Sequence, residues 1–379
     1  MHILIAPNAF KHSLTANETA DAIQEGLKRS GLNCTSECFP IADGGDGTGY
    51  LIVEKCGGVW HEYDVHDPLG RVIKAPLGII DQGKTAVIEM ADASGIRLLN
   101  AEERSPLMAS SFGTGELIRS ALDRQVQKIV IGIGGSATVD GGIGILSALG
   151  IKFRDADGAE LAAFPVNISR FRQIDRSGLD SRILNCQITV LCDVDNLLLG
   201  ENGSAAIFGP QKGASQSDVK LLDLALTNLS GLAFESTGIK MNEIIHGGAA
   251  GGIAAALFTF LNAILVNGGE HFLQITGFAK SLKNADILIT GEGSLDEQTL
   301  QGKGPFAVAK FAKEKNIMVI GIAGRVPLQE NAELNRYFDI LMPIGNQPED
   351  LNTAIKVTAS NLIRTAIVIG KFLSLPKTI

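Results

Sequence analysis

The sequence has little of what several classes of protein require. Only 5 of its 379 residues are cysteines, an odd number without zinc-ligand spacing, which indicates reduced core thiols in a cytoplasmic protein. Aromatic residues make up 5% of the chain, and no run of basic residues occurs. Because neutralising the phosphates of a nucleic acid needs clustered Lys and Arg, a net charge of −8 argues against a nucleic-acid-binding protein.

Long hydrophobic segments are also missing. Residues 1–14 contain no positively charged region and no long apolar core, so we expect no signal peptide. The apolar stretch at residues 251–266 is rich in Ala and Gly and is too short to span a membrane. The sequence therefore predicts a cytoplasmic protein that does not associate with a membrane.

Glycine is abundant, at 44 residues, and strand and helix patterns alternate at both ends of the chain. Residues 60–95 differ, because short extended runs separated by turn residues indicate an antiparallel hairpin region. A chain of 379 residues is long enough for two domains. We expect an α/β protein in which residues 1–60 and 280–379 form one parallel-sheet domain, interrupted by a second α/β domain at 61–279.

The segment ITGEGSLDEQTLQGKGP, residues 289–305, follows a buried strand predicted at 286–289 and precedes a helix. It carries Glu292, Asp296 and Lys303 on a glycine-rich backbone. In α/β sheets, ligands bind where strands end and helices begin. Opposite charges on such a loop suit a metal ion and a phosphate.

Two further loops combine charged and hydroxyl side chains near the N-terminus. In IAPNAFKHSL, Lys11 and Ser13 follow the first strand and could meet an anion at a helix N-terminus, or be a solvated lysine and a helix cap. In ADGGDGT, Asp43 and Asp46 could present carboxylates to Mg²⁺, although tight-turn chemistry explains Asp-Gly pairs equally well.

The middle of the chain adds three loops of the same kind. In GIGGSATVDGG, the backbone of Gly134 and Gly135 and the hydroxyl of Ser136 could approach phosphate oxygens. CDVDN ends a strand with Asp193, a candidate metal ligand, and FGPQKGAS carries Lys212. Together these loops indicate a phosphate-handling site, because phosphoryl transfer needs cations on the phosphate, carboxylates on Mg²⁺ and a base.

Alternatives to this site have weaker support in the sequence. No P-loop and no G-x-S-x-G nucleophile elbow occurs. The six histidines lie in separate segments without ligand spacing. Asp140, in the glycine loop of the middle segment, is either a ligand or the cap of the following helix.

Eight motifs in this order resemble those of the bacterial type I glycerate kinases, over roughly residues 1–370: IAPNAFKHSL, ADGGDGT, GTGELIRSAL, GIGGSATVDGG, CDVDN, FGPQKGAS, GAAGG and TGEGSLDEQTLQGKGP. The resemblance implies ATP-dependent phosphorylation of D-glycerate, usually to 2-phosphoglycerate, with 3-phosphoglycerate as the alternative product. It also implies a flavodoxin-like domain built from both chain ends, an inserted α/β domain and a substrate cleft between them.

The resemblance also implies roles for single residues. Glu292 and Asp296 would orient Mg²⁺ or the glycerate hydroxyls, and Asp296, further from the strand, is the favoured base. Asp193 and Lys11 complete the catalytic set, and Asp43 and Asp193 are the candidate Mg²⁺ ligands. Binding of substrate or phosphate is expected at Ser13, Asp43, Asp46, Gly134, Gly135, Ser136, Lys212 and Lys303.

The sequence departs from the family pattern in places. Asn8 and Ala9 stand where the family commonly has Asp and Ser, and Ser294 stands where Arg is frequent. The loss of an acid at position 8 puts a catalytic role there in doubt. Two alternatives therefore remain, namely another small-molecule phosphotransferase on the same fold and an inactive ligand-binding relative. A homodimer is compatible with the sequence, which does not determine the oligomeric state.

Overall fold

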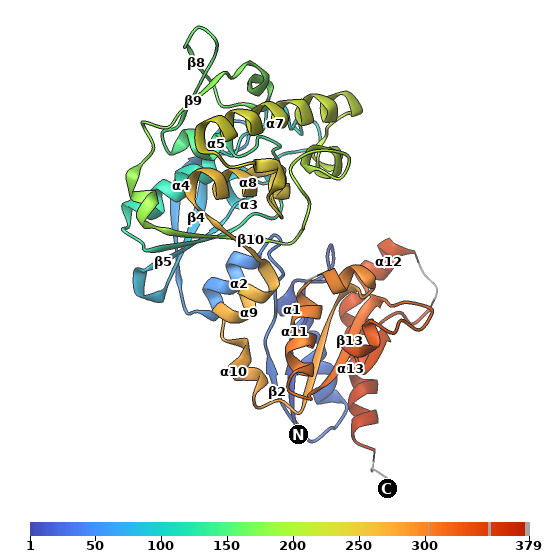
Figure 1. The fold of residues 1–379 in the computed structure, drawn as a ribbon. Helices are drawn as coiled ribbons and strands as arrows, with labels where there is room; N and C mark the ends of the chain where they lie inside the picture. Colours follow the sequence, from blue (N-terminus) through green and yellow to red (C-terminus); the bar gives the residue numbers. More distant parts are fainter. Residues whose placement is uncertain (302, 348–349, 376–379) are drawn as a thin grey trace. The chain divides into compact units, whose positions relative to one another are not determined.

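The computed structural model describes residues 1–301, 303–347 and 350–375 (Figure 1). The chain forms two compact units. Unit 1 comprises Met1–Asp43 and Gly269–Ile379, and unit 2 comprises Gly44–Gly268. The predicted fold class is confirmed, because strands from both chain ends share one parallel sheet and an α/β segment is inserted between them.

The sheet of unit 1 has five strands, all parallel, in the order β14-β13-β12-β1-β2. Numbered along this unit alone, that order is 2-1-3-4-5, the flavodoxin-like arrangement. Strand β1 lies inside the sheet, with Ile3 opposite both Ser36 and Ile287. The strands are β1 (His2–Ile5), β2 (Thr35–Cys38), β12 (Ile287–Ser294), β13 (Met318–Arg325) and β14 (Ile340–Pro343).

Helices bury both faces of this sheet, which is why residues 3–5 of β1 and 287–289 of β12 are apolar. Helices α1 and α13 pack together over the face that carries Ile3 and Ile5, and α11 contacts β12 and β13. A capping box formed by Thr15 and Glu18 begins α1. The helices are α1 (Ala16–Arg29), α9 (Gly268–Ile275), α10 (Phe278–Leu282), α11 (Gly304–Lys313), α12 (Leu351–Lys356) and α13 (Thr358–Leu373).

The contact between α1 and α13 predicts opposite effects for alanine at two helical glycines. A Cβ at Gly26 would lie 2.4 Å from the carbonyl oxygen of Ile363 and 2.5 Å from Ala366 Cβ. Gly26→Ala should therefore force the helices apart and lower the free energy of unfolding by about 1–3 kcal/mol. Gly231 lies inside α7 (Gln216–Thr237), and a Cβ there would have nothing within 4 Å. Gly231→Ala should therefore raise the free energy of unfolding by about 0.5–1 kcal/mol.

Urea denaturation of the two variants checks this prediction. If the two substitutions change the free energy of unfolding equally, the contact between α1 and α13 does not require glycine at position 26.

The larger sheet of unit 2 has the order β11-β10-β6-β5-β4-β3. Strands β3, β4 and β5 are antiparallel neighbours, which confirms the hairpin region predicted at residues 60–95. Strands β5, β6, β10 and β11 are parallel, so their carboxyl ends meet at one edge. The strands are β3 (Val59–His66), β4 (Val72–Ile80), β5 (Thr85–Glu89), β6 (Lys128–Gly132), β10 (Gln187–Cys192) and β11 (Ile264–Asn267), with β7 (Lys152–Arg154), β8 (Glu160–Leu161) and β9 (Gln173–Asp175) in a small second sheet.

Helix α2 (Thr48–Lys55) contacts β4, β5 and β6 of unit 2. The units change at residues 43–44 and 268–269, whereas the sequence placed the limits at 60–61 and 279–280. The remaining helices of unit 2 are α3 (Ala91–Ser94), α4 (Phe112–Asp123), α5 (Ile143–Ala148), α6 (Ser204–Phe208), α7 and α8 (Ala249–Leu261).

Two general expectations concern thiols and hydrophobic helices. None of the five cysteines, Cys34, Cys38, Cys56, Cys186 and Cys192, forms a disulfide. Across the described ranges, none of the helices has the length and apolar character needed to cross a membrane.

Candidate active site

The candidate site of unit 1 lies where β1 and β12 end. Strand β12 continues to Ser294, with Glu292 opposite Ala323 of β13. The predicted end of this strand at Ile289 was therefore wrong by five residues, because pairing with β13 continues through the glycines that the sequence pattern assigns to a loop. As a result, Glu292 is a strand residue that is only 7% exposed.

Glu292 lies among charged and hydroxyl side chains of the same unit. Thr299 donates a hydrogen bond of 3.3 Å from its hydroxyl to Glu292 Oε1, and Lys303 Nζ lies 3.9 Å from that oxygen. Burial raises the pKa of Glu292 to about 7, with the charges of Lys303 and Lys11 opposing the rise and Asp43 adding to it. A carboxyl group with this pKa can accept and release a proton near neutral pH.

Asn8 provides a physical account of one departure from the family pattern. Its side-chain amide donates a hydrogen bond of 3.0 Å to Asp43 Oδ2, and its Oδ1 accepts one of 2.8 Å from the backbone N–H of Ala9. An aspartate at position 8 would instead place a second carboxylate against Asp43, close to Glu292. Asn8 therefore holds Asp43 without adding negative charge.

Asp296 lies in the turn after β12, and its contacts fit a structural role. Its carboxylate accepts a hydrogen bond of 2.9 Å from the hydroxyl of Ser294. Its backbone N–H donates to Thr299 Oγ1 at 3.1 Å, and Thr299 N donates back to the Asp296 carbonyl at 2.9 Å. These bonds are those of a turn that begins the 3₁₀ segment Glu297–Gln301. A role of Asp296 as base remains a prediction.

Three more predicted residues belong to this unit. Lys11 is exposed in the turn before α1. The hydroxyl of Ser13 donates a hydrogen bond of 2.7 Å to the carbonyl of Ile355 in α12, so its donor is used inside the unit. Lys303 is the N-cap residue of α11, with its amine directed close enough to Glu292 for an ion pair.

In unit 2, the structure brings Asp46 together with the glycine loop after β6. A Cβ at Gly134 would lie 2.5 Å from the backbone nitrogen of Asp46, and one at Gly135 would lie 3.4 Å from Asp46 Cγ. Gly135 also has a φ of +69°, which favours glycine. These glycines are therefore required for the close approach of two loops, an arrangement that the sequence pattern did not reveal.

Lys212 joins the same loop from the 3₁₀ segment Pro210–Lys212. It is 3% exposed, and its Nζ donates hydrogen bonds of 2.7 Å to Ser136 Oγ and of 2.7 Å to the carbonyl of Thr138. Burial lowers the pKa of Lys212 to about 7, against the charge of Asp140. Its contacts are thus to the loop itself.

Asp140 lies two residues before Gly142, the N-cap residue of the helix that follows the loop. Its fully buried carboxylate accepts hydrogen bonds from Ser111 N at 2.8 Å, Ser111 Oγ at 2.7 Å, Gly142 N at 3.0 Å and Gly144 N at 3.3 Å. Burial raises the pKa of Asp140, and these hydrogen bonds oppose the rise. Two of these donors belong to Ser111, the N-cap residue of α4, and two lie at the start of α5, so the carboxylate links the beginnings of the two helices.

Asp193 is exposed directly after β10, at the carboxyl edge of the parallel strands. Asp195, two residues later, forms an ion pair of 3.0 Å with His246 Nδ1. Within residues 1–301, 303–347 and 350–375, no group of three or more His, Cys, Asp or Glu side chains is arranged to hold a metal ion.

Sequence reasoning missed an ionic cluster in unit 2. Arg97 contacts both Asp46 and Asp92, and Tyr50 donates to Asp92. Glu89, the last residue of β5, lies fully buried nearby. One signal was present in the sequence, since an acid ends the otherwise apolar strand TAVIE.

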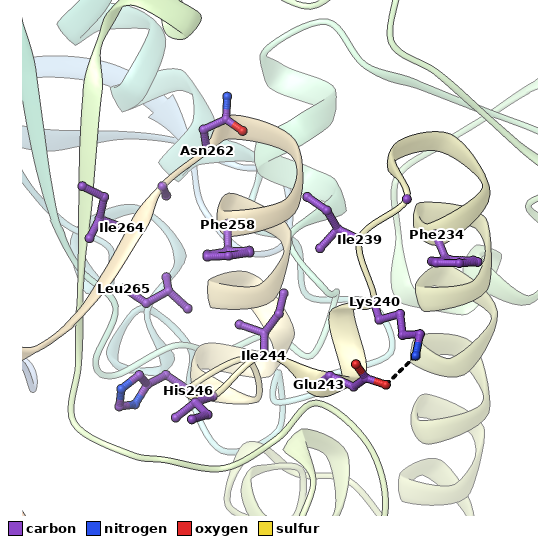
Figure 2. A pocket seen from close by; sticks show the side chains of 13 residues that line it. Phe234, Ile239, Lys240, Glu243, Ile244, His246, Phe258, Asn262, Ile264 and Leu265 are labelled. Atoms are coloured by element: carbon purple, nitrogen blue, oxygen red, sulfur yellow. Dashed lines mark hydrogen bonds and ion pairs between the residues drawn. The ribbon is translucent and has the colours of Figure 1, made fainter.

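A cavity of about 1030 Å³ lies elsewhere in unit 2, between the ends of α7 and α8 and strand β11 (Figure 2). Apolar side chains such as Phe234, Phe258 and Leu265 line it, and an ion pair of 2.8 Å joins Lys240 to Glu243 on one side. None of the predicted site residues lines this cavity, so it is separate from the loops described above.

Known proteins similar to this chain agree with the motifs. The sequence profile of the glycerate kinase family matches residues 3–374. Glycerate kinase of Bacillus subtilis is 42% identical over 378 residues, covering 100% of this chain and 99% of the relative. Glycerate 2-kinase of Escherichia coli is 40% identical over 376 residues, covering 98% and 99%.

A solved structure is also similar over nearly the whole chain. A crystal structure assigned as glycerate kinase 2 from Salmonella typhimurium LT2 matches with a TM-score of 0.84 and 41% identity, covering 98% of both chains. Matches of this length and identity extend over both units. The chain is therefore a kinase that belongs to the glycerate kinase family.

Proposed function

We propose that this protein phosphorylates D-glycerate with ATP as the phosphoryl donor and forms 2-phosphoglycerate. The observation that carries this proposal is Glu292, a buried carboxyl group with a pKa of about 7, flanked by Lys303 at the carboxyl end of a central strand. The name of the similar Escherichia coli protein, a glycerate 2-kinase, favours phosphorylation at the 2-hydroxyl.

Glu292 acts as the general base in this proposal. It takes the proton of the acceptor hydroxyl, whose oxygen attacks the γ-phosphorus while the bond from that phosphorus to ADP breaks. The proton stays on the Glu292 carboxyl until the product leaves. Lys303 and Lys11 supply positive charge on the same unit, which suits the carboxylate of glycerate or a phosphate oxygen.

The glycine loop of unit 2 binds phosphate in this proposal. Gly134 and Gly135 follow each other in this loop, and consecutive backbone N–H groups in a turn attract anions. Lys212 serves indirectly, because its two hydrogen bonds fix Ser136 and Thr138 within the loop.

Magnesium is expected to accompany the nucleotide, because it neutralises phosphate charge in phosphoryl transfer. Mg²⁺ usually takes one or two protein carboxylates together with phosphate oxygens and water. The exposed carboxylate of Asp193, at a strand end, fits such a ligand, and Asp43 is the second candidate. A cytoplasmic location is proposed from the sequence, whose odd number of cysteines fits reduced thiols.

An ADP-release assay with Mg²⁺ and ATP tests the reaction. We expect turnover with D-glycerate and far less with L-glycerate, glycerol or hydroxypyruvate, because the site must match both the carboxylate and the position of the hydroxyl. In a phosphorus NMR spectrum, a 2-phosphate couples to one proton and gives a doublet, whereas a 3-phosphate couples to two and gives a triplet. We expect the doublet.

The same assay separates the alternatives. Turnover with another acceptor in place of D-glycerate would indicate a different phosphotransferase. Binding of D-glycerate without turnover, by a protein whose circular dichroism shows it folded, would indicate an inactive relative.

A further inference from the structure

Arg97 lies between two carboxylates of unit 2. Its Nη1 donates a hydrogen bond of 3.0 Å to Asp46 Oδ1, and its Nη2 donates to Asp92 Oδ1. The hydroxyl of Tyr50 lies 3.0 Å from both oxygens of Asp92, and the Tyr50 ring packs on Trp60 with the ring centroids 4.8 Å apart. A continuous chain of contacts therefore extends from a packed aromatic pair to Asp46.

Acidic side chains outnumber the cation in this cluster. Asp92 is 8% exposed, and burial raises its pKa while Arg97 opposes the rise. Burial also raises the pKa of Glu89 well above its ordinary value. Arg97 contacts two acids, Asp46 and Asp92, so hydrogen-bond acceptors outnumber the cation in this cluster.

The cluster is attached to the glycine loop. The backbone N–H of Ile96 donates a hydrogen bond of 2.8 Å to the carbonyl of Gly135, and Gly95 pairs with Ser136 as an isolated β-bridge. Gly134 is in close contact with the backbone of Asp46. Arg97 and Asp46 thus approach the loop from two different segments, and the Arg97–Asp46 ion pair closes the arrangement.

One buried polar atom in the cluster is unsatisfied. Glu89 Oε2 accepts a hydrogen bond of 2.7 Å from Gly49 N, but Glu89 Oε1 has no hydrogen-bond partner among the described residues. The pKa shifts of Glu89 and Asp92 also respond to Asp46. The acids of this cluster therefore interact, and Arg97, which contacts both Asp46 and Asp92, opposes the rise in the pKa of Asp92.

We propose that Arg97 is a positioning residue, which fixes the carboxylate of Asp46 beside the glycine loop so that Asp46 accepts a hydrogen bond from a hydroxyl group of a reactant. The side chain of Asp46 remains 42% exposed while it contacts Arg97, so it can bind a ligand at the same time. This inference rests on the proposed function, whose reactants both carry hydroxyl groups, namely the acceptor and the ribose of ATP.

A double-mutant cycle tests the inference on the full-length enzyme. Arg97→Met and Asp46→Ala should each raise the KM of one reactant about tenfold to hundredfold, the usual effect of a lost hydrogen bond to a charged group, with kcat within about twofold. Because Arg97 acts through Asp46, the double variant should be no worse than Asp46→Ala alone. Arg97→Lys should restore part of the affinity, since one amine cannot span both carboxylates.

Two arms of the experiment identify the hydroxyl. A rise in the KM of D-glycerate alone assigns it to the acceptor. A rise in the KM of ATP, with 2′-deoxy-ATP or 3′-deoxy-ATP insensitive to Asp46→Ala, assigns it to the ribose. Effects of Arg97→Met and Asp46→Ala that simply add, or a fall in kcat with both KM values unchanged, would overturn the inference.

Arg71→Met is the matched control. Arg71 also joins two carboxylates of unit 2, those of Asp67 and Glu103, so its loss removes a comparable ion pair. We expect a similar fall in Tm from this variant and wild-type KM values. If Arg97→Met fails to fold, Arg97→Lys replaces it in the double-mutant cycle, and the same question is asked, namely whether its effect on KM adds to that of Asp46→Ala. Absence of wild-type turnover with D-glycerate would reject the proposed function, whereas additive effects in an active enzyme reject only the role of Arg97.

Discussion

Replacing Glu292 with Gln should lower kcat about 10²- to 10⁴-fold, the usual loss when a general base is removed, with Tm at pH 8 unchanged or higher. Glu292 is 7% exposed, and Gln has nearly the same shape and can still accept from Thr299. The fold should therefore tolerate the substitution. Steady-state kinetics and a thermal melt of the same preparation measure both effects.

The sign of the stability effect follows from the pKa. Burial raises the pKa of Glu292 to about 7, above its ordinary value of 4.5, so the folded protein favours the protonated form. The stability that this group contributes is present at low pH and is lost as the pH rises through about 7. Gln cannot ionise, so Glu292→Gln should lose nothing over that range.

The pH dependence of kcat gives a second measure of the same group. Because a base must be deprotonated to act, kcat of the wild-type enzyme should fall as the pH drops below about 7. That decline should be absent from the residual activity of Glu292→Gln.

Asp296→Asn is the control for this prediction. Its carboxylate accepts from Ser294 within a turn, and Asn serves turns as well as Asp, so we expect stability to change by only a few tenths of a kcal/mol. If kcat falls more than about 10²-fold in Asp296→Asn but stays near wild type in Glu292→Gln, the base is Asp296.

Replacing Lys212 with Met should lower kcat/KM about 10- to 100-fold, because a small displacement of groups that position a substrate is enough to slow the reaction this much. The Nζ of Lys212 is the donor that joins Ser136 to the carbonyl of Thr138 within the loop. Met fills a similar volume but donates no hydrogen bond, so the loop loses this connection. We expect only a small change in Tm, because removing a buried amine offsets the two lost bonds.

The pH dependence of stability separates Lys212 from ordinary lysines. Burial lowers its pKa from 10.5 to about 7, so between these values the unfolded chain binds a proton that the folded protein does not. This group therefore makes wild-type stability increase as the pH rises from about 7 towards 10.5. In Lys212→Met that part of the increase should be missing.

Lys220→Met provides the comparison, since Lys220 is exposed on α7. Kinetics and urea denaturation at pH 7 and pH 9 should show wild-type behaviour for this variant. Identical pH dependence in Lys212→Met and the wild type would show that Lys212 has an ordinary pKa. Unchanged kcat/KM in Lys212→Met would remove Lys212 from the set that positions the loop.

The sequence by itself determined the fold class and the family. Parallel strands buried on both faces are mostly apolar, so β1 and the first residues of β12 are recognisable as short apolar runs. Turn residues separate the extended runs of the hairpin at residues 60–95, and that local chemistry made the hairpin predictable. The eight motifs kept their order over both units, which identified the family before any geometry was known.

Only the tertiary structure decided the state and the partners of individual site residues. Glu292 and Asp296 are both acids of one glycine-rich segment, but pairing with β13 buries Glu292 and raises its pKa, while Asp296 bonds within a turn. The burial of Lys212 could not be predicted from the sequence either, because residues more than 70 positions away accept its hydrogen bonds.

The same reason explains why Arg97 escaped notice in the sequence. Its partner Asp46 is 51 residues away along the chain, and neither residue belongs to a pattern that joins them. Periodicity and turn chemistry report on neighbours within a few positions. Desolvation and ion pairing depend on distances that folding sets between remote segments, and these determine which of the many acids and lysines can take part in the reaction.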